Sequence, residues 1–289
     1  MQIDRRPSNE QGGPSSPGLE PSPLLVGAVA YSANAVPIWE GIREYFRVAP
    51  VPMDFVLFSN YERQVDHLLE GKIDIAWNTN LAWVRTVGLT EGSCRALAMR
   101  DTDLNFCTVF VARAGCGYQG IESLRGRRLA LGSRDSAQAA ILPLHFLARS
   151  GLGPDQLSVI RFDSDVGKHG DTGASELDAV QAVLDDRADV AAIGITTWNS
   201  LQSGQLAPGA LEAVWKSPVY CHCNFTALES LDPELTAAWT DWLLKMDWDE
   251  PQQRRIMEME GLRRWVSPQL EGYQSLFKAV MEQEIPLRW

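Results

Sequence analysis

The sequence predicts a bilobal α/β protein, with two α/β lobes joined by two hinge crossings and a helical C-terminal tail. The two lobes are predicted from a unit that occurs twice, at 61–83 (YERQVDHLLEGKIDIAWNTNLAW) and at 176–198 (ELDAVQAVLDDRADVAAIGITTW). Each copy contains an amphipathic helix, a turn with a basic residue, and an apolar strand that opens after an aspartate and ends in a polar loop with a tryptophan. A continuous apolar strand is typical of a sheet covered on both faces, so each copy is half of an α/β unit.

The other elements are predicted from apolar runs and helical periodicity. Strands alternate with helices up to Pro218, and the part after Pro218 is mostly helical, which predicts the tail. Strands are predicted at 24–32, 53–59, 94–100, 106–113, 128–133, 157–162 and 211–217, and helices at 36–46, 136–151, 232–246, 250–261 and 271–283. The resulting organisation is a disordered leader at 1–23, a first lobe from 24–109 with 219–289, and a second lobe at 110–218.

Composition limits the classes of partner and the compartment. The net charge of −11 argues against nucleic acid or an anionic membrane surface as partner, and no apolar run approaches the roughly 18 residues of a membrane span. Residues 1–23 are rich in Pro, Gly and Ser and lack the apolar core of a secretory signal. This predicts a cytoplasmic protein, or a periplasmic one if the N-terminus is truncated. Five cysteines in a chain without an export signal predict free thiols rather than a disulfide framework.

The stretch 129–151 (LALGSRDSAQAAILPLHFLARSG) is the first candidate for a binding site. A strand stops at Gly132, a polar turn follows and an apolar helix begins, so free backbone N–H groups and the positive end of the helix dipole meet there. Ser and Asp are also ordinary N-cap residues, so a capped helix without a ligand is the competing interpretation. The candidate residues of this turn are Ser133, Ser136 and Gln138.

Polar residues also follow three other predicted strands, at the ends where α/β sheets bind ligands. Each group has a structural alternative, namely helix capping, an Asx turn or a buried core tryptophan. Amides and hydroxyls in one turn suit hydrogen bonding to a polar ligand, and a tryptophan can stack on a planar or cationic one. The candidates are Tyr31, Ser32 and Asn34 after the first strand, Trp77, Asn78, Thr79 and Asn80 in the first copy of the unit, and Thr196, Thr197 and Trp198 in the second.

The glycine-rich segment 167–173 (GKHGDTG) is a further candidate. Its glycines allow a close approach to a ligand, and His169 within it is of the residue type that most often serves as a switch at physiological pH. A solvent-exposed loop is the competing interpretation. An insertion beside the cleft would change specificity without disturbing the fold.

A Cys-His-Cys segment at 221–223 raises the question of a metal. Cys221, Cys223 and Cys107 are weak candidates for a soft-metal site if their segments are neighbouring hinge strands. In a strand, however, the two cysteines of the segment share one face and His222 points the opposite way. No cofactor is therefore predicted, and a metal site stays an alternative.

At these stretches the sequence resembles the phosphate, phosphite and phosphonate substrate-binding proteins of ABC transporters, which have the type II periplasmic-binding-protein fold. The resemblance follows the family's order over almost everything after residue 24. It implies a bilobal type II fold, a small polar or anionic ligand enclosed by lobe closure, and a transporter as docking partner. The matching stretches are YERQVDHLLEGKIDIAWNTNLAWVR, ESLRGRRLALGSRDSAQAAILPLHFLARSGLGPDQL, ELDAVQAVLDDRADVAAIGITTW and LDPELTAAWTDWLLKMD.

The sequence departs from that family at positions that contact the ligand. Phosphonate binders present a Ser-Thr-Ser type turn at 136–138, and here only Ser136 keeps a hydroxyl. Asp178 corresponds to an acidic residue that often follows a histidine in the family, and here it follows a leucine. Cys107 stands where an aromatic residue often lines the hinge side. The resemblance adds Asp178 and Cys107 to the candidates, and a phosphonate-type ligand stays one of the alternatives.

Two main functions compete. The first is a ligand-binding protein, whose partners are a small-molecule ligand and either a transporter or a metabolic enzyme. The second is a cytoplasmic enzyme on the same fold that acts on a small metabolite, with a metal held by cysteine and histidine as one version, since some menaquinone- and thiamine-pathway enzymes are similar to binding proteins. A third is a cytosolic sensor or carrier that passes its ligand to an enzyme. The enzyme interpretation names as acid–base and thiol candidates His169, Glu176, Asp178, Cys107 and Cys221.

Overall fold

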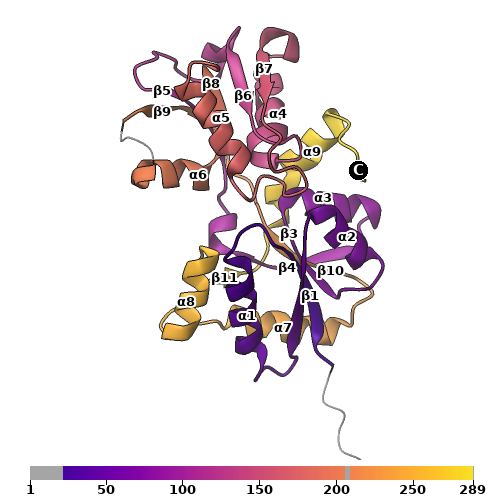
Figure 1. Ribbon diagram of the computed structural model, residues 1–289. Coiled ribbons are helices and arrows are strands. Elements are labelled where there is room, and N and C mark those ends of the chain that lie inside the picture. The colour runs from indigo at the N-terminus through magenta and orange to yellow at the C-terminus, as the bar shows by residue number, and fades with distance from the viewer. Residues whose placement is uncertain (1–21, 206–208, 289) are drawn as a thin grey trace, which may run out of the picture.

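The computed structural model of the 289-residue chain describes residues 22–205 and 209–288. It has two separate β-sheets, one at each end of an elongated molecule, with helices packed around each sheet (Figure 1). The predicted mixed α/β architecture is confirmed. The leader predicted at 1–23 lies outside the described residues except for its last two positions.

The first lobe is built on a six-stranded sheet with the order β11-β4-β10-β3-β1-β2. β1 pairs in parallel with β2 and β3, and β10 runs antiparallel between β3 and β4. Its strands are β1 (Leu24–Val29), β2 (Met53–Phe58), β3 (Ile75–Asn78), β4 (Cys94–Arg100), β10 (Asn224–Leu228) and β11 (Trp265–Val266). Its helices are α1 (Ala35–Phe46), α2 (Tyr61–Leu69), α3 (Asn80–Leu89), α7 (Pro233–Leu244) and α8 (Pro251–Glu260).

The second lobe is built on a five-stranded sheet with the order β7-β6-β8-β5-β9. β6 pairs in parallel with β7 and β8, and β5 is antiparallel to both β8 and β9. Its strands are β5 (Thr108–Arg113), β6 (Arg128–Leu131), β7 (Ser158–Arg161), β8 (Val190–Gly194) and β9 (Leu211–Lys216), and its helices are α4 (Leu142–Arg149), α5 (Ala174–Leu184) and α6 (Ile195–Ser200). Shorter helical turns lie at Asp101–Asp103, Ile121–Leu124, Ala137–Ile141 (a π-helical turn), Pro154–Gln156, Leu201–Gln205 and Leu270–Tyr273.

The repeated unit has the same structure in both lobes. The aspartate before its strand binds the edge of the neighbouring strand: Asp74 accepts a hydrogen bond from the Leu25 N–H at 2.7 Å, and Asp189 accepts one from the Arg128 N–H at 2.8 Å. Each carboxylate therefore fixes where a parallel pair begins. The repeated sequence pattern therefore corresponds to the same hydrogen bond at the start of β3 and of β8.

The chain crosses between the lobes after β4 and again after β9. The two crossing segments pair with each other, because Phe106 and Tyr220 exchange two backbone hydrogen bonds of 3.0 and 2.9 Å. After β11, the chain reaches α9 (Gln274–Glu282), which packs against α3 of the first lobe and α4 of the second. The tail therefore contacts both lobes.

Several predicted elements differ from the structure. The polar loops expected after the repeated strands are helices, since α3 begins two residues after β3 and α6 begins directly after β8. Thr79 caps α3 by accepting the Ala82 N–H at 3.2 Å, which explains why a polar turn starts a helix. The tail contains the predicted helices, α7, α8 and the C-terminal α9, and it also contributes two strands that were not predicted, because β10 lies between β3 and β4 in the first sheet and β11 extends that sheet.

Candidate functional site

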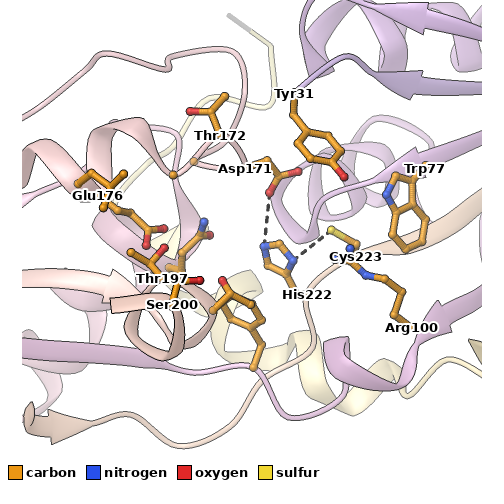
Figure 2. A pocket seen from close by; sticks show the side chains of 16 residues that line it. Tyr31, Trp77, Arg100, Asp171, Thr172, Glu176, Thr197, Ser200, His222 and Cys223 are labelled. Carbon is orange, nitrogen blue, oxygen red and sulfur yellow. Dashed lines mark hydrogen bonds and ion pairs between the residues drawn. The ribbon is translucent and has the colours of Figure 1, made fainter. Parts of the chain in front are cut away.

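A cavity of about 360 Å³ lies between the two lobes, within the size range of small-molecule sites. Its wall combines strand ends of the first lobe, the second crossing segment, and the loop and helix starts of the second lobe (Figure 2). The lining residues are Tyr31, Trp77, Arg100, Phe106, Gln138, Gly170, Asp171, Thr172, Gly173, Glu176, Leu177, Thr196, Thr197, Ser200, His222 and Cys223.

Arg100 organises the first-lobe wall. Its guanidinium donates to both carboxylate oxygens of Asp103 at 2.6 and 2.9 Å, and to Glu260 Oε1 at 3.2 Å. It also lies over the Trp77 ring, with 5.2 Å to the ring centroid. The Tyr31 hydroxyl points toward the second carboxylate oxygen of Glu260 at 3.5 Å. The Arg100 guanidinium therefore already has two carboxylate partners.

The two carboxylates behind Arg100 have opposite pKa shifts. Burial acts against ionisation of Asp103, but the Arg100 charge and the His222 hydrogen bond outweigh it and lower the pKa of Asp103 to about 2. Burial raises the pKa of Glu260 to about 7, with Arg100 opposing the rise and Asp103 and Asp171 adding to it. Asp103 is thus the main charge partner of Arg100, and Glu260 titrates close to neutral pH.

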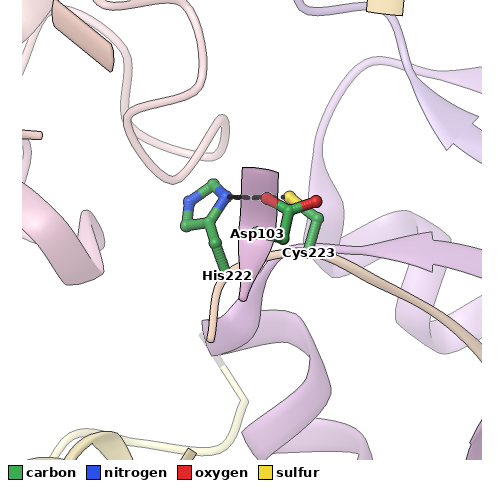
Figure 3. A group of neighbouring side chains, drawn as sticks. All are labelled: Asp103, His222 and Cys223. Atoms are coloured by element: carbon green, nitrogen blue, oxygen red, sulfur yellow. Dashed lines mark hydrogen bonds and ion pairs between the residues drawn. The ribbon is translucent and has the colours of Figure 1, made fainter. Parts of the chain in front are cut away.

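His222 stands at the floor of the cavity, on the second crossing segment. Its Nδ1 lies 3.3 Å from Asp103 Oδ1 and 3.1 Å from Cys223 Sγ (Figure 3). Its ring stacks on Phe106 with centroids 4.4 Å apart, and its Nε2 faces Asp171 Oδ1 at 3.8 Å. The prediction that strand alternation separates His222 from both cysteines is wrong, because β10 begins only at residue 224 and 221–223 is not a strand.

The possible metal ligands form a different group from the predicted one. Asp103, His222 and Cys223 have ligand atoms within 4.8 Å of one another. Cys221 instead points its thiol at the backbone oxygen of Gln269, at 3.3 Å. All five cysteines are free thiols, as predicted. Because Arg100 occupies both oxygens of Asp103, the trio is already a hydrogen-bonded unit, and metal binding stays an untested alternative.

Glu176 organises the second-lobe wall. This carboxylate, at the start of α5, accepts the Gly194 N–H at 2.8 Å. Burial raises its pKa, and hydrogen bonds from Thr197, Gly194 and Gln138 oppose the rise. Gln138 is 3% exposed, and its Oε1 has no hydrogen-bond partner among the described residues. Glu176 therefore holds the amide and hydroxyl of two cavity residues in fixed orientations.

The loop at 165–173 brings Asp171 across to the first lobe. Asp171 accepts a hydrogen bond from the hydroxyl of Tyr61, a fully buried residue of α2. In Figure 2, Asp171 lies between Tyr31 and His222. Thr172 beside it donates to Asp165 at 2.8 Å. One carboxylate of the second lobe thus completes the first-lobe side of the cavity.

A buried ionic cluster next to the cavity joins the lobes. His169 Nδ1 lies 2.6 Å from Thr79 Oγ1, and its ring stacks on Tyr61 with centroids 4.7 Å apart. Arg85 Nη1 donates to Glu62 at 2.9 Å and lies 3.1 Å from His169 Nε2. Burial alone would raise the pKa of Glu62, but the hydrogen bond and charge of His169, together with Arg85, lower it to about 2. This cluster fixes the loop at 165–173 against α2 and α3.

The polar turn at 133–136 is filled by the chain itself. Ser133 Oγ donates to the Asp165 carboxylate, and Asp135 accepts the Gly167 N–H at 2.5 Å. The Ser136 hydroxyl caps the π-helical turn by accepting the Ala139 N–H at 3.2 Å. All three side chains are at most 1% exposed. The capping interpretation of this turn therefore describes the structure.

The structure brings five of the predicted residues to the cavity wall: Tyr31, Trp77, Gln138, Thr196 and Thr197. Several other candidates lie behind it as buried supports, and these are Asn78, Thr79, Asn80, Cys107, Ser133, Ser136, His169 and Trp198. Ser32, Asn34 and Asp178 are exposed and lie outside the wall among the described residues. Direct ligand contact by these eleven residues stays a prediction without support from their placement.

Sequence reasoning missed Arg100, Asp171, Thr172 and Ser200, and treated His222 and Cys223 only as metal candidates. Arg100 is the last residue of a strand that sequence reasoning identified only as an element of the fold, and Ser200 ends a helix where the sequence predicts a loop. The glycines at 167–173 do indicate the segment that carries Asp171. From this segment Asp171 and Thr172 line the cavity, whereas His169 does not.

The comparisons with known proteins agree with this geometry. Residues 29–273 match the family described as "ABC transporter, phosphonate, periplasmic substrate-binding protein". The chain belongs to this family. The resemblance to it that the sequence motifs indicated is confirmed, as is the type II periplasmic-binding-protein fold.

Two similar proteins share less than a quarter of their residues with this chain. The chain is 23% identical, over 81% of its length and 80% of the relative's, to the probable ABC transporter phosphite-binding protein PhnD1 of Prochlorococcus marinus. The structure of that PhnD1 with methylphosphonate has a TM-score of 0.70 at 19% identity, covering 90% of this chain and 98% of the other. XAC2383 of Xanthomonas citri bound to ATP has a TM-score of 0.69 at 16% identity and the same coverage. These likenesses establish the fold.

Membership of the family also indicates the partners and the cellular location of this class of protein. Its members are periplasmic components of ABC transporters, so a small-molecule ligand and a transporter are the partners of this class. A metabolic enzyme as partner has no support, and the cytoplasmic prediction stays unconfirmed. In the part of the chain that the structure describes, every helix is too short or too polar to cross a membrane.

Proposed function

We propose that this chain is the substrate-binding component of an ABC import system, and that it holds a small polar molecule in the cavity between its lobes. The observation that carries the proposal is that one cavity of suitable size takes its wall from both lobes and from a crossing segment. A ligand there contacts both lobes at once, so its binding energy favours the closed arrangement. A transporter then recognises the closed form.

The cysteines support a binding protein rather than a thiol enzyme. Burial raises the pKa of Cys221 to about 11 and raises the pKa of Cys223 and Cys107 as well. A nucleophilic cysteine requires the opposite shift, because the thiolate is the reactive form. The enzyme hypothesis therefore has no activated thiol among these three residues.

The family description also supports action outside the cytoplasmic membrane. Substrate-binding proteins of importers meet their ligand on the outer side of that membrane, and the family is described as periplasmic. We therefore propose a periplasmic or cell-surface location. Fractionation of the native host tests this location: recovery with the periplasm or envelope is expected, and recovery only with the cytosol contradicts it.

Ligand titration tests the proposed function. A panel of small phosphonates, phosphite, sulfonates, amines and amino acids is screened by thermal shift, and each hit is titrated by calorimetry. Glu176→Gln is expected to weaken a hit at least tenfold, because Glu176 orients Thr197 and Gln138 at the cavity. Glu122→Gln, at an exposed position outside the wall, serves as the matched control and should leave affinity within twofold.

Two results would contradict the proposed function. The first is that no compound of the panel binds the folded protein. The second is that Glu122→Gln and Glu176→Gln weaken binding equally, which would place the ligand away from the cavity.

A further inference from the structure

We infer that the ligand of this cavity is a small organic cation with N–H donors, rather than a phosphonate oxyanion. The inference rests on the proposed function, because it names the class of molecule that the same cavity takes. Three observations carry it: the occupied turn at 133–136, the excess of carboxylates around the cavity, and the unpaired acceptors on its wall.

The first observation is that the turn which would hold an oxyanion is already closed. Ser133 and the Gly167 N–H are bound by the chain's own Asp165 and Asp135. Gly170 packs on the same turn: a Cβ built on it would lie 2.9 Å from Ser136 Cβ and 2.8 Å from Gln138 Nε2. A phosphonate at this turn would have to displace two buried carboxylates and a packed loop. Their negative charges would also oppose it.

The second observation is the charge balance of the wall. Asp171 and Glu176 line the cavity from the second lobe. On the other side, the positive charge of Arg100 is shared between Asp103 and Glu260 through four side-chain and backbone hydrogen bonds. The carboxyl groups of Asp171, Glu176, Asp103 and Glu260 thus lie around the Arg100 guanidinium and the imidazole of His222. Burial raises the pKa of Glu176 and of Glu260, so a bound cation would stabilise their ionised forms, whereas a dianion would disfavour those forms and be repelled by ionised Asp103.

The third observation is the set of polar atoms that await a partner. Gln138 Oε1 is a buried acceptor with no partner among the described residues, while its amide nitrogen binds Glu176. His222 Nε2 is likewise unpartnered among the described residues, and Asp103 favours the tautomer with the proton on Nδ1, which leaves Nε2 an acceptor. The nearer oxygen of Asp171 lies 3.8 Å from it. Three acceptors of the cavity thus match a ligand that donates N–H bonds.

The aromatic residues of the wall suit the same class of ligand. Tyr31 and Phe106 line the cavity together with Trp77, one face of which already binds the Arg100 guanidinium. Aromatic faces attract cations and provide apolar surface for a hydrocarbon body. An ammonium or amidinium group would pair with the Asp171 carboxylate, and the carbon skeleton of the same ligand would pack against these rings.

Matched pairs of probes test the inference. Each pair shares a carbon skeleton and differs in its charged group: benzylamine with benzylphosphonate, and ethylamine with ethylphosphonate. All four compounds are titrated by calorimetry at pH 7, together with methylphosphonate and 2-aminoethylphosphonate. The amine of a pair is expected to bind at least tenfold more tightly than its phosphonate. Tighter binding of a phosphonate than of its matched amine overturns the inference but leaves the proposed function intact, as does tighter binding of 2-aminoethylphosphonate than of ethylamine. If no probe of either class binds, both statements fail.

Two variants separate the charge of Asp171 from its structural contact. Asp171→Asn removes the charge and is expected to weaken amine binding at least tenfold. Tyr61→Phe removes the hydrogen bond to Asp171 but keeps the charge, and should change amine affinity less than threefold. If Asp171→Asn does not fold, Glu176→Gln provides the second loss of charge on the wall. Unchanged amine affinity in a folded Asp171→Asn or Glu176→Gln protein contradicts the inference.

Discussion

Replacing Gly170 with alanine tests the packing that closes the turn at 133–136. Gly170 has φ = +83°, a left-handed conformation that disfavours a side chain, and its place against the turn leaves no room for one. The backbone conformation costs alanine about 1–2 kcal/mol. Forcing a methyl group against Ser136 and Gln138 adds about 1–3 kcal/mol. Gly170→Ala is therefore expected to lower the free energy of unfolding by about 2–5 kcal/mol.

Gly115→Ala is the matched control for the backbone effect. Gly115 has nearly the same φ, +77°, but a Cβ there meets nothing within 4 Å. It should lose only the conformational contribution, about 1–2 kcal/mol. The difference between the two variants isolates the packing of the loop on the turn.

Urea unfolding at pH 7 measures both free energies, and hydrogen exchange follows the backbone amides at 133–141. The packing account predicts a larger stability loss for Gly170→Ala than for Gly115→Ala, with faster exchange at 133–141 only in Gly170→Ala. Equal losses in the two variants, or exchange at the turn unchanged by Gly170→Ala, would refute the reasoning that the loop closes this turn.

Three further predictions concern the residues around the cavity. Burial raises the pKa of Glu260 from 4.5 to about 7, so Glu260 binds a proton more tightly in the folded protein than in the unfolded chain. The free energy of unfolding should therefore fall as the pH rises from about 4.5 to 7. Urea titrations should show that Glu260→Gln lacks about 3 kcal/mol of this decline. Asp103 has the opposite sign, because its pKa is lowered from 3.8 to about 2. Its contribution of about 2 kcal/mol is present above pH 4 and is lost toward pH 2, so Asp103→Asn should flatten the acid limb of the unfolding free energy. Asn78→Ala should cost about 1–3 kcal/mol, because it removes the 2.9 Å acceptor of the buried Gln64 amide and leaves that amide only its 2.8 Å bond to the Trp77 carbonyl. Calorimetry should show ligand affinity unchanged, and a tenfold loss of affinity would instead place Asn78 in the binding site.

The fold could be predicted because its signals are local. The repeated unit places an aspartate just before a strand in each lobe, and in both lobes that carboxylate binds the neighbouring strand near its start, at Leu25 in β1 and at Arg128 in β6. Hydrophobic runs then locate the other strands to within a few residues. β10 was harder to find, because it forms from a Cys- and Asn-containing stretch whose partners β3 and β4 are more than a hundred residues earlier in the chain.

The site could be predicted only in part because it depends on which way polar side chains point. Ser133 and Ser136 have the residue types of an anion clamp, yet the inserted loop supplies Asp165 as an internal partner for Ser133. His169 has the type of a ligand-binding residue, yet Arg85 and Glu62 bury it. Insertions change the partners of neighbouring turns without leaving a local pattern, so only the three-dimensional arrangement separates supports from contacts.

The central claim is that one ligand contacts both lobes in the cavity, and hydrogen exchange with and without a bound probe from the calorimetric screen tests it most directly. We predict that saturating ligand slows exchange together at 29–34 and 220–224 on the first-lobe side and at 169–177 and 194–200 on the second-lobe side, with α7, which contributes no residue to the cavity wall, unaffected. Protection confined to one lobe, or concentrated on α7 or another surface away from the cavity, would contradict the account.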